Sequence, residues 1–203
     1  MSVVRSFAKP AAIAFVRDLA FDGKDLWITD ITNGQLHQMT VDGVLKRTYN
    51  ITANPRGLTF DGKHLVYGDD GTDLIYFVEP SSGIVVRTTP SIAPFIPFPD
   101  GMTFDGKHPW IVRTSNLSQV NIDGVQIRQV VLDAAYKNGL AFDGKYIWYS
   151  DADNGLIVQI DRDGIIKRSF ASPGLGTEMG LTFDGKHLWH VDETTNLFYQ
   201  IKI

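Results

Sequence analysis

The sequence predicts an all-β fold: a five-bladed β-propeller with four antiparallel strands per blade, whose ring is closed by the N-terminal strand. Three observations predict it. The tetrapeptide Phe-Asp-Gly-Lys begins at positions 21, 60, 104, 142 and 183, so the repeats are 39, 44, 38 and 41 residues apart. Each repeat holds short β-type segments separated by turn residues, and the two chain ends complement each other. Four short strands in a repeat of about 40 residues are typical of a propeller blade.

The four strands are clearest in the fourth repeat. Residues 139–142 form a first apolar segment, and the turn Asp143-Gly144 leads into a second segment at 146–151. Asp-Gly between apolar segments favours a tight hairpin. Two further glycine-containing turns separate the segments 156–161 and 165–170. Applied to all repeats, this pattern predicts blades at approximately 16–51, 55–92, 99–133, 137–170 and 178–203.

The chain ends predict how the ring closes. The fifth repeat stops at Ile203 after three segments, so its fourth strand is missing. Near the N-terminus, Arg5-Ser6-Phe7 is identical to Arg168-Ser169-Phe170 in the last strand of the fourth repeat. We therefore expect residues 2–8 to complete the fifth blade, and residues 1–203 to form one domain. Such closure leaves no open sheet edge to pair with another chain.

Composition narrows the function. The 203 residues carry a formal net charge of −4 and are 43 % hydrophobic, which is typical of a globular chain and argues against nucleic-acid binding. No apolar run reaches the roughly 20 residues of a membrane span. The N-terminus lacks the apolar stretch of a secretory signal, which favours a cytoplasmic location. The absence of cysteine excludes disulfides and thiolate metal sites. We expect a monomer without a cofactor.

Residues that recur in most repeats are interpreted as structural. The four tryptophans share one position in the second strand of four repeats, so we expect them to pack between blades: Trp27, Trp110, Trp148 and Trp189. Three histidines follow the tetrapeptide directly and are expected in turns rather than in a metal cluster: His64, His108 and His187. The segment from Asp151 resembles the start of a calcium loop, but its twelfth position is Arg162 rather than glutamate. No metal site is predicted.

Charged residues are predicted to gather at one mouth of the central channel. In a propeller, the start of the first strand of a blade and the end of its second strand lie on the same face. The starts are Arg17, Arg56, Asp100, Asn138 and Met179, and the ends, always 13 residues later, are Asp30, Asp69, Arg113, Asp151 and Asp192. We expect each start to lie beside the end from its own blade. These couples are either cross-strand ion pairs or a ring of charges that holds a polar or zwitterionic molecule.

Three deviations from the repeat are further candidates. The fifth blade has surplus acid in Glu178, Asp192 and Glu193, and His190 lies two residues before Asp192, so that a histidine–carboxylate couple is possible as a general base. We prefer a packing role for His190 and predict no catalytic residue, keeping His190, Asp192 and Glu178 only as weak catalytic candidates. The first blade has Asp18 where the other four have glycine.

The connection before the third blade is long, rich in proline and apolar. It spans residues 89–100 and includes Phe95 and Phe98. It is expected either to cover the end of a blade or to form an apolar rim beside the channel mouth. The predicted ligand-binding set is therefore Arg17, Arg56, Asp100, Arg113, Asn138, Asp151, Asp192, Phe95 and Phe98.

The rhythm of Gly57-Leu-Thr-Phe-Asp-Gly62 followed by Leu-Trp-x-x-Asp, as in Leu188 to Asp192, resembles NHL-type and virginiamycin-B-lyase-like propellers. More distantly, the five-blade count is similar to that of glutaminyl cyclotransferases. The latter resemblance implies a carboxylate acid–base in the channel, for which Glu178 and Asp100 are the candidates. The Glu/Gln-Gly-Leu of that family is replaced by Arg56-Gly, Asp100-Gly, Asn138-Gly and Met179-Gly, and its channel tryptophan has no match.

Two classes of function follow. The preferred interpretation is a non-catalytic binding propeller that holds a small polar molecule or a protein partner at the channel mouth. The alternative is an enzyme, either of the glutaminyl cyclotransferase type or a metal-assisted hydrolase or lyase. The metal-assisted type would draw on Asp151, Asp192, Glu178 and Asn138, but the neighbouring arginines disfavour a bound cation.

Overall fold

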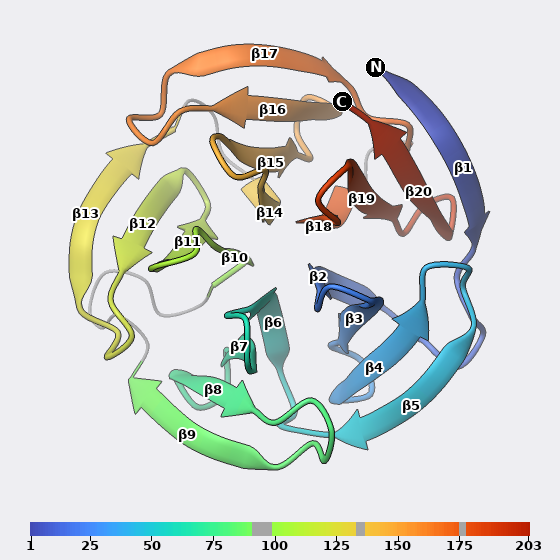
Figure 1. Ribbon diagram of the computed structural model, residues 1–203, viewed down its shortest axis with the longest axis vertical. Coiled ribbons are helices and arrows are strands. Elements are labelled where there is room, and N and C mark those ends of the chain that lie inside the picture. Colours follow the sequence, from blue (N-terminus) through green and yellow to red (C-terminus); the bar gives the residue numbers. More distant parts are fainter. Residues whose placement is uncertain (91–98, 133–136, 175–177) are drawn as a thin grey trace.

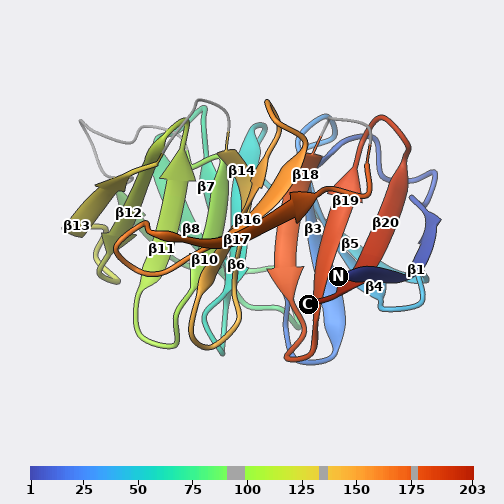
Figure 2. The ribbon, with the colours of Figure 1, turned by 90° about the horizontal axis from the view of Figure 1, so that it is seen from above.

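The computed structural model describes residues 1–90, 99–132, 137–174 and 178–203, without the side chains of residues 178 and 179. Its strands form five separate four-stranded antiparallel sheets arranged around a central axis (Figure 1). Seen from the side, the inner strands run between the two faces of a disc (Figure 2). The predicted five-bladed propeller is therefore confirmed. The described residues contain no helix, and hence none that could cross a membrane.

Each sheet is one blade, and its strands follow one another from the axis outward. The first two blades consist of β2 (Val16–Phe21), β3 (Asp25–Asp30), β4 (Gln35–Thr40), β5 (Leu45–Asn50), β6 (Pro55–Phe60), β7 (Leu65–Asp69), β8 (Leu74–Val78) and β9 (Val85–Pro90). The third and fourth consist of β10 (Gly101–Phe104), β11 (Pro109–Arg113), β12 (Asn116–Val120), β13 (Gln126–Val131), β14 (Lys137–Phe142), β15 (Ile147–Asp151), β16 (Leu156–Ile160) and β17 (Ile166–Ala171).

The fifth blade joins the two ends of the chain. It consists of β18 (Glu178–Phe183), β19 (His187–Asp192), β20 (Leu197–Lys202) and, outermost, β1 (Ser2–Ala8). Strand β1 pairs antiparallel with β20 from Ser2 opposite Lys202 to Ala8 opposite Leu197. Closure by the N-terminal strand is thus as predicted.

Ion pairs show that β1 behaves like any other outer strand. Arg5 on β1 reaches Asp42 in the outer turn of the next blade, at 2.5 Å. Two other outer strands make the same contact with the blade that follows them, through Arg87–Asp123 at 2.5 Å and Arg128–Asp163 at 2.6 Å. These pairs are largely exposed, so each contributes about 1 kcal/mol at most.

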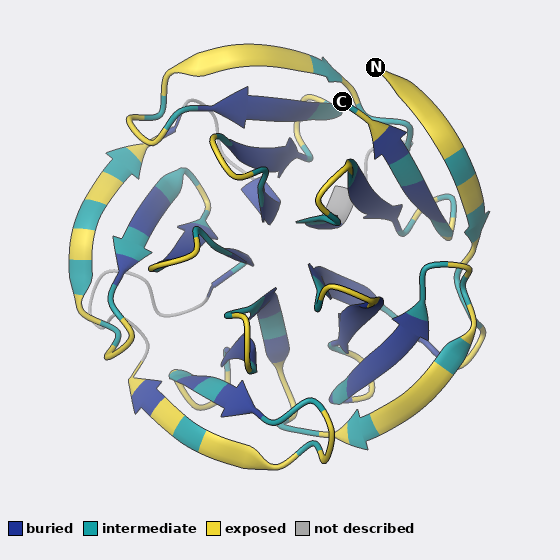
Figure 3. Cartoon of the chain, viewed as in Figure 1, coloured by how far each residue is buried: buried dark blue, intermediate teal, exposed yellow. Residues whose placement is uncertain are grey.

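The core lies between neighbouring blades. The inner strands are buried and the outer strands are largely exposed (Figure 3). The four tryptophans are fully buried, and each packs against the following blade; Val66 takes this place in the second blade. The packing role predicted for these residues is confirmed.

The repeated tetrapeptide is explained by its aspartate. In the first blade, Asp22 accepts the backbone N–H groups of Lys24 and Asp25 with one oxygen and the indole N–H of Trp27 with the other, at 2.7 Å. The same indole bond recurs in three more blades. In the second blade, which has no tryptophan, His64 Nδ1 lies 3.2 Å from Asp61 instead. The motif therefore builds the turn and anchors the core.

Candidate functional site

Cross-strand register differs from the expectation at the channel mouth. A β-bulge interrupts the first strand of four blades, so that the residue facing the end of the second strand comes one position earlier than expected. The observed pairs are Val16–Asp30, Pro55–Asp69, Lys137–Asp151 and Glu178–Asp192. The predicted couples of Asp30, Asp69, Asp151 and Asp192 with Arg17, Arg56, Asn138 and Met179 are therefore not the cross-strand neighbours. A bulge adds one residue to one strand only, and no signal in the repeat indicated it.

The aspartates at the ends of the second strands are buried, and they accept hydrogen bonds from the backbone of nearby loops. Asp30 accepts the backbone N–H groups of Ala14 at 2.7 Å and Thr32 at 3.0 Å, and Asp69 accepts those of Asn54, Gly71 and Thr72. Burial alone would raise the pKa of both carboxyl groups, but the hydrogen bonds outweigh it and hold each pKa below its usual range. These carboxylates fasten the loops on the mouth side of the first two blades.

Two members of the predicted ligand-binding set lie in the equivalent positions. Asp151 accepts from the buried Lys137 Nζ at 2.7 Å and from Asn154, and Asp192 accepts the backbone N–H of Thr195 at 2.6 Å. Asp151 is 4 % exposed and Asp192 is fully buried. Again burial raises the pKa of Asp151, but the Lys137 and Asn154 bonds reverse the shift and lower it. Sequence reasoning missed Lys137.

Four other predicted residues meet at the channel mouth. Arg17 Nη2 lies 2.5 Å from Asp100 Oδ1, and Arg17 Nη1 donates to Asn138 Oδ1 at 3.2 Å. Arg56 Nη1 lies 3.4 Å from the same Asp100 oxygen. We call Arg17, Arg56, Asp100 and Asn138 the mouth cluster. Its members come from four different blades, whereas the sequence predicted contacts within each blade.

Asp70 adds a negative charge beside the mouth cluster, and strand β11 ends next to it. Arg56 is also paired with Asp70 through both Nε, at 2.7 Å, and Nη2. Arg113 ends strand β11, and the backbone N–H of the next residue, Thr114, lies 3.4 Å from Asp100 Oδ2. Within the cluster the side chains are 10 % exposed at Arg17, 17 % at Asp100 and 25 % at Arg56. The cluster is therefore open to solvent through Asp100 and Arg56.

The remaining candidates lie elsewhere. Phe95 and Phe98 fall outside the described residues, as does the side chain of Glu178. His190 is fully buried; its ring stacks on Tyr199 and its Nε2 lies 3.2 Å from Ser172 Oγ. Burial lowers the pKa of His190 to about 4, although Asp192 acts in the opposite direction. A neutral, buried imidazole packed on a tyrosine fits the structural role that we preferred for it.

Asp18 is fully buried on β2 and reaches the innermost strands of the next two blades. Its Oδ2 accepts the backbone N–H groups of Leu58 at 2.8 Å and Met102 at 3.0 Å, and its Oδ1 accepts that of Leu19 at 2.9 Å. One carboxyl group thus ties together the innermost strands of three blades. Burial raises the pKa of Asp18 to about 8, while the three N–H donors favour its ionised form. The sequence signal for this position was the aspartate itself, because the other four blades have glycine there.

The described residues contain no group of three or more histidine or acidic side chains placed to hold a metal ion. No protein-family model and no curated protein sequence matches the chain.

Solved structures with the same fold are found at low sequence identity. The chain is similar to glutaminyl cyclase of Myxococcus xanthus, with a TM-score of 0.83 and 14 % identity, over 99 % of this chain and 95 % of that one. It is similar to virginiamycin B lyase of Staphylococcus aureus, with a TM-score of 0.56 and 19 % identity, over 88 % of this chain and 62 % of that one. A chain of a nidogen–laminin complex matches with a TM-score of 0.67 and 19 % identity, over 94 % and 76 %. The resemblance seen in the repeats is confirmed as a likeness of fold.

Proposed function

We propose that this protein is a non-catalytic binding propeller that holds a small polar ligand with a carboxylate group at the mouth cluster. The observation that carries the proposal is the convergence of Arg17 and Arg56 on one carboxylate, Asp100, at the opening of the channel. Two guanidinium groups held close together concentrate positive charge, although Arg56 is also paired with Asp70. A ligand carboxylate would bind to this concentrated positive charge.

Charge and geometry support an anionic group on the ligand. Arg17 and Arg56 lie 2.5 and 3.4 Å from the same oxygen of Asp100, and Arg56 is also paired with Asp70, so two guanidinium groups are held close together at the channel mouth. Guanidinium groups bind carboxylates through two parallel N–H donors. Asn138 adds an amide to the same cluster. Since Asp70 and Asp100 place negative charge beside these arginines, a zwitterion such as an amino acid fits both signs of charge.

Stability alone accounts poorly for the cluster. Partly exposed ion pairs contribute about 1 kcal/mol or less each. An ion pair that only adds stability needs two residues, whereas the mouth cluster brings together side chains from four blades. Ion pairs at the outer rim, such as Arg87–Asp123, each join two blades with one arginine and one aspartate. The mouth cluster is built differently, and this difference favours ligand binding.

A thermal-shift experiment tests the proposal. The purified protein is heated with glycine, L-glutamate, succinate or glucose, each over a range of concentrations. A ligand at 100 times its dissociation constant adds about 2.7 kcal/mol, which raises the melting temperature by several degrees at this chain size. We expect L-glutamate or succinate to act and glucose to be inert. A shift with glucose alone, or no shift with any carboxylate, contradicts the proposal.

A second candidate function is the cyclisation of an N-terminal glutamine. It is supported by the likeness to a glutaminyl cyclase over 99 % of this chain, and its carboxylate candidates are Asp100 and Glu178. Against it, both oxygens of Asp100 are already engaged, one with the two arginines and one with the backbone of Thr114. Incubation with a glutaminyl peptide followed by mass spectrometry tests this function. Loss of 17 mass units would establish the enzyme, and an unchanged peptide mass would leave the binding function.

A further inference from the structure

The channel has a second opening that the mouth cluster does not use. A pocket of about 110 Å³ lies at the ends of the innermost strands, four residues along the strand from Arg17. It is lined by the phenylalanines of all five repeats and by three threonines: Phe21, Phe60, Phe104, Phe142, Phe183, Thr59, Thr103 and Thr182. Nothing in the mouth-cluster proposal depends on this pocket.

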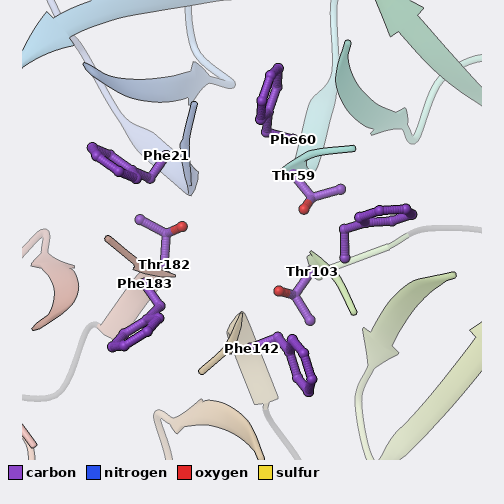
Figure 4. Close-up of a pocket in the computed structure, with 8 residues that line it drawn as sticks. Phe21, Thr59, Phe60, Thr103, Phe142, Thr182 and Phe183 are labelled. Carbon is purple, nitrogen blue, oxygen red and sulfur yellow. The ribbon is translucent and has the colours of Figure 1, made fainter. Parts of the chain in front are cut away.

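The pocket is polar despite its phenylalanines. Phe21, Phe60, Phe142 and Phe183 turn their rings away from the axis, so their backbones line the space (Figure 4). The hydroxyl oxygens of Thr59, Thr103 and Thr182 turn toward the centre (Figure 4). Three hydroxyl groups from the second, third and fifth blades therefore face one small space.

The backbone adds donors and acceptors of its own. The innermost strand of each blade pairs on one side only, so its other edge faces the channel. The N–H groups of Leu58 and Met102 bond to Asp18 across the channel and show which residues turn to this edge. Backbone groups two residues further along a strand face the same side, which brings those of Phe60 and Phe104 to the pocket. Each such residue offers both an N–H and a C=O group.

Charge around the opening is balanced. Each of the five turns that surround it contains the sequence Asp-Gly-Lys, and thus one negative and one positive side chain. These Asp-Gly-Lys segments therefore carry no net formal charge. Asp18 lies further along the channel, because its partners Leu58 and Met102 immediately precede Thr59 and Thr103. The residues that line the pocket are all uncharged, and the pocket is therefore a neutral, polar recess.

We propose that this pocket binds a small neutral molecule with several hydroxyl groups. Hydroxyl groups donate and accept hydrogen bonds, which matches a wall made of threonine hydroxyls and paired backbone groups. The volume of about 110 Å³ is several times the roughly 10–15 Å³ that one water molecule needs in a cavity, so the space admits more than a single water molecule. A three-carbon polyol is of this order of size.

An NMR titration tests the proposal with glycerol as the probe. The ¹⁵N-labelled full-length protein is titrated, and the amide signals of Phe60 and Phe104 are followed. We expect saturable shifts at these amides. In the variant Thr59→Val/Thr103→Val the affinity should fall about tenfold or more, because two hydroxyl partners are lost. Thr88→Val, the same change on the exposed strand β9, should bind as the wild type does.

Other results would overturn the proposal. Shifts that do not saturate, or that persist unchanged in the double variant, would mean that no such site exists. Saturation with phosphate but not with glycerol would show a site for anions instead. If the double variant does not fold, Thr103→Ser and Thr103→Val replace it. The serine variant keeps the hydroxyl group and should bind, whereas the valine variant should bind several times more weakly.

Discussion

Asp18 makes the free energy of unfolding of this protein decrease as the pH rises. Burial raises the pKa of its carboxyl group to about 8, from an ordinary value of 3.8. At pH values between 3.8 and about 8, the Asp18 carboxyl group holds a proton in the folded protein and releases it in the unfolded chain. The free energy of unfolding contributed by Asp18 is therefore fully present below about pH 4 and is lost as the pH rises through 8. Replacing Asp18 by asparagine keeps the shape and removes the titration.

The size of this pH dependence follows from the single proton that the Asp18 carboxyl group binds. Each pH unit within this window changes the free energy of unfolding by about 1.36 kcal/mol relative to the variant. Between pH 5.5 and 7.5 the wild type should therefore lose about 2.7 kcal/mol relative to Asp18→Asn. Other titrating groups, such as His190, are present in both proteins and cancel in the comparison.

Urea unfolding followed by tryptophan fluorescence measures this difference, since all four tryptophans are buried. Both proteins are unfolded at pH 5.5, 6.5 and 7.5, and the exposed rim residue Asp163 supplies a control variant, Asp163→Asn, that should follow the wild type. Parallel stability profiles for wild type and Asp18→Asn would refute the reasoning. They would mean that the three N–H donors hold Asp18 ionised throughout.

Two further changes test the packing of the blades and the buried histidine. A Cβ atom on Gly101 would lie 1.7 Å from the carbonyl oxygen of Asn138, so Gly101→Ala must push β10 and β14 apart. It should cost about 3 kcal/mol and lower the melting temperature by several degrees; an unchanged melting temperature in calorimetry would contradict this contact. His190→Tyr introduces the residue that the second and fourth blades carry at this position. Because the pKa of His190 is lowered to about 4, the wild type should lose stability as the pH falls from about 6.5 to 4, by about 3 kcal/mol. The variant should not show this loss in urea unfolding, and an equal loss in both proteins would count against a buried neutral His190.

The fold could be predicted from the sequence because each blade repeats the same local signals. The Asp-Gly turn, the buried tryptophan and the aspartate that joins them all lie within one hairpin, as Asp22 and Trp27 show. Closure of the ring could be predicted because β1 keeps the sequence of an outer strand. Such local contacts depend on neighbouring residues and need no knowledge of the assembled ring.

The site could be predicted only in part. Arg17, Arg56, Asp100 and Asn138 were identified, but their partners were not. The bulge in the innermost strands shifts the register by one residue, and the contacts that result run between blades across the channel. Lys137 was missed because its charge is matched by Asp151 only after that shift. The pocket lined by the phenylalanines was missed because its walls are partly backbone groups, which leave no pattern in the sequence, and because its threonines were interpreted as part of the structural repeat.

The central claim is that the mouth cluster binds a ligand rather than fastening the blades. Isothermal titration of Arg56→Gln, with the carboxylate that gives the largest thermal shift in the wild type, tests this most directly. The matched control is Arg87→Gln, which breaks an arginine–aspartate pair at the outer rim. We predict that Arg56→Gln loses at least tenfold in affinity while its melting temperature stays close to that of Arg87→Gln. Unchanged affinity together with a much lower melting temperature for Arg56→Gln would show that the cluster is structural.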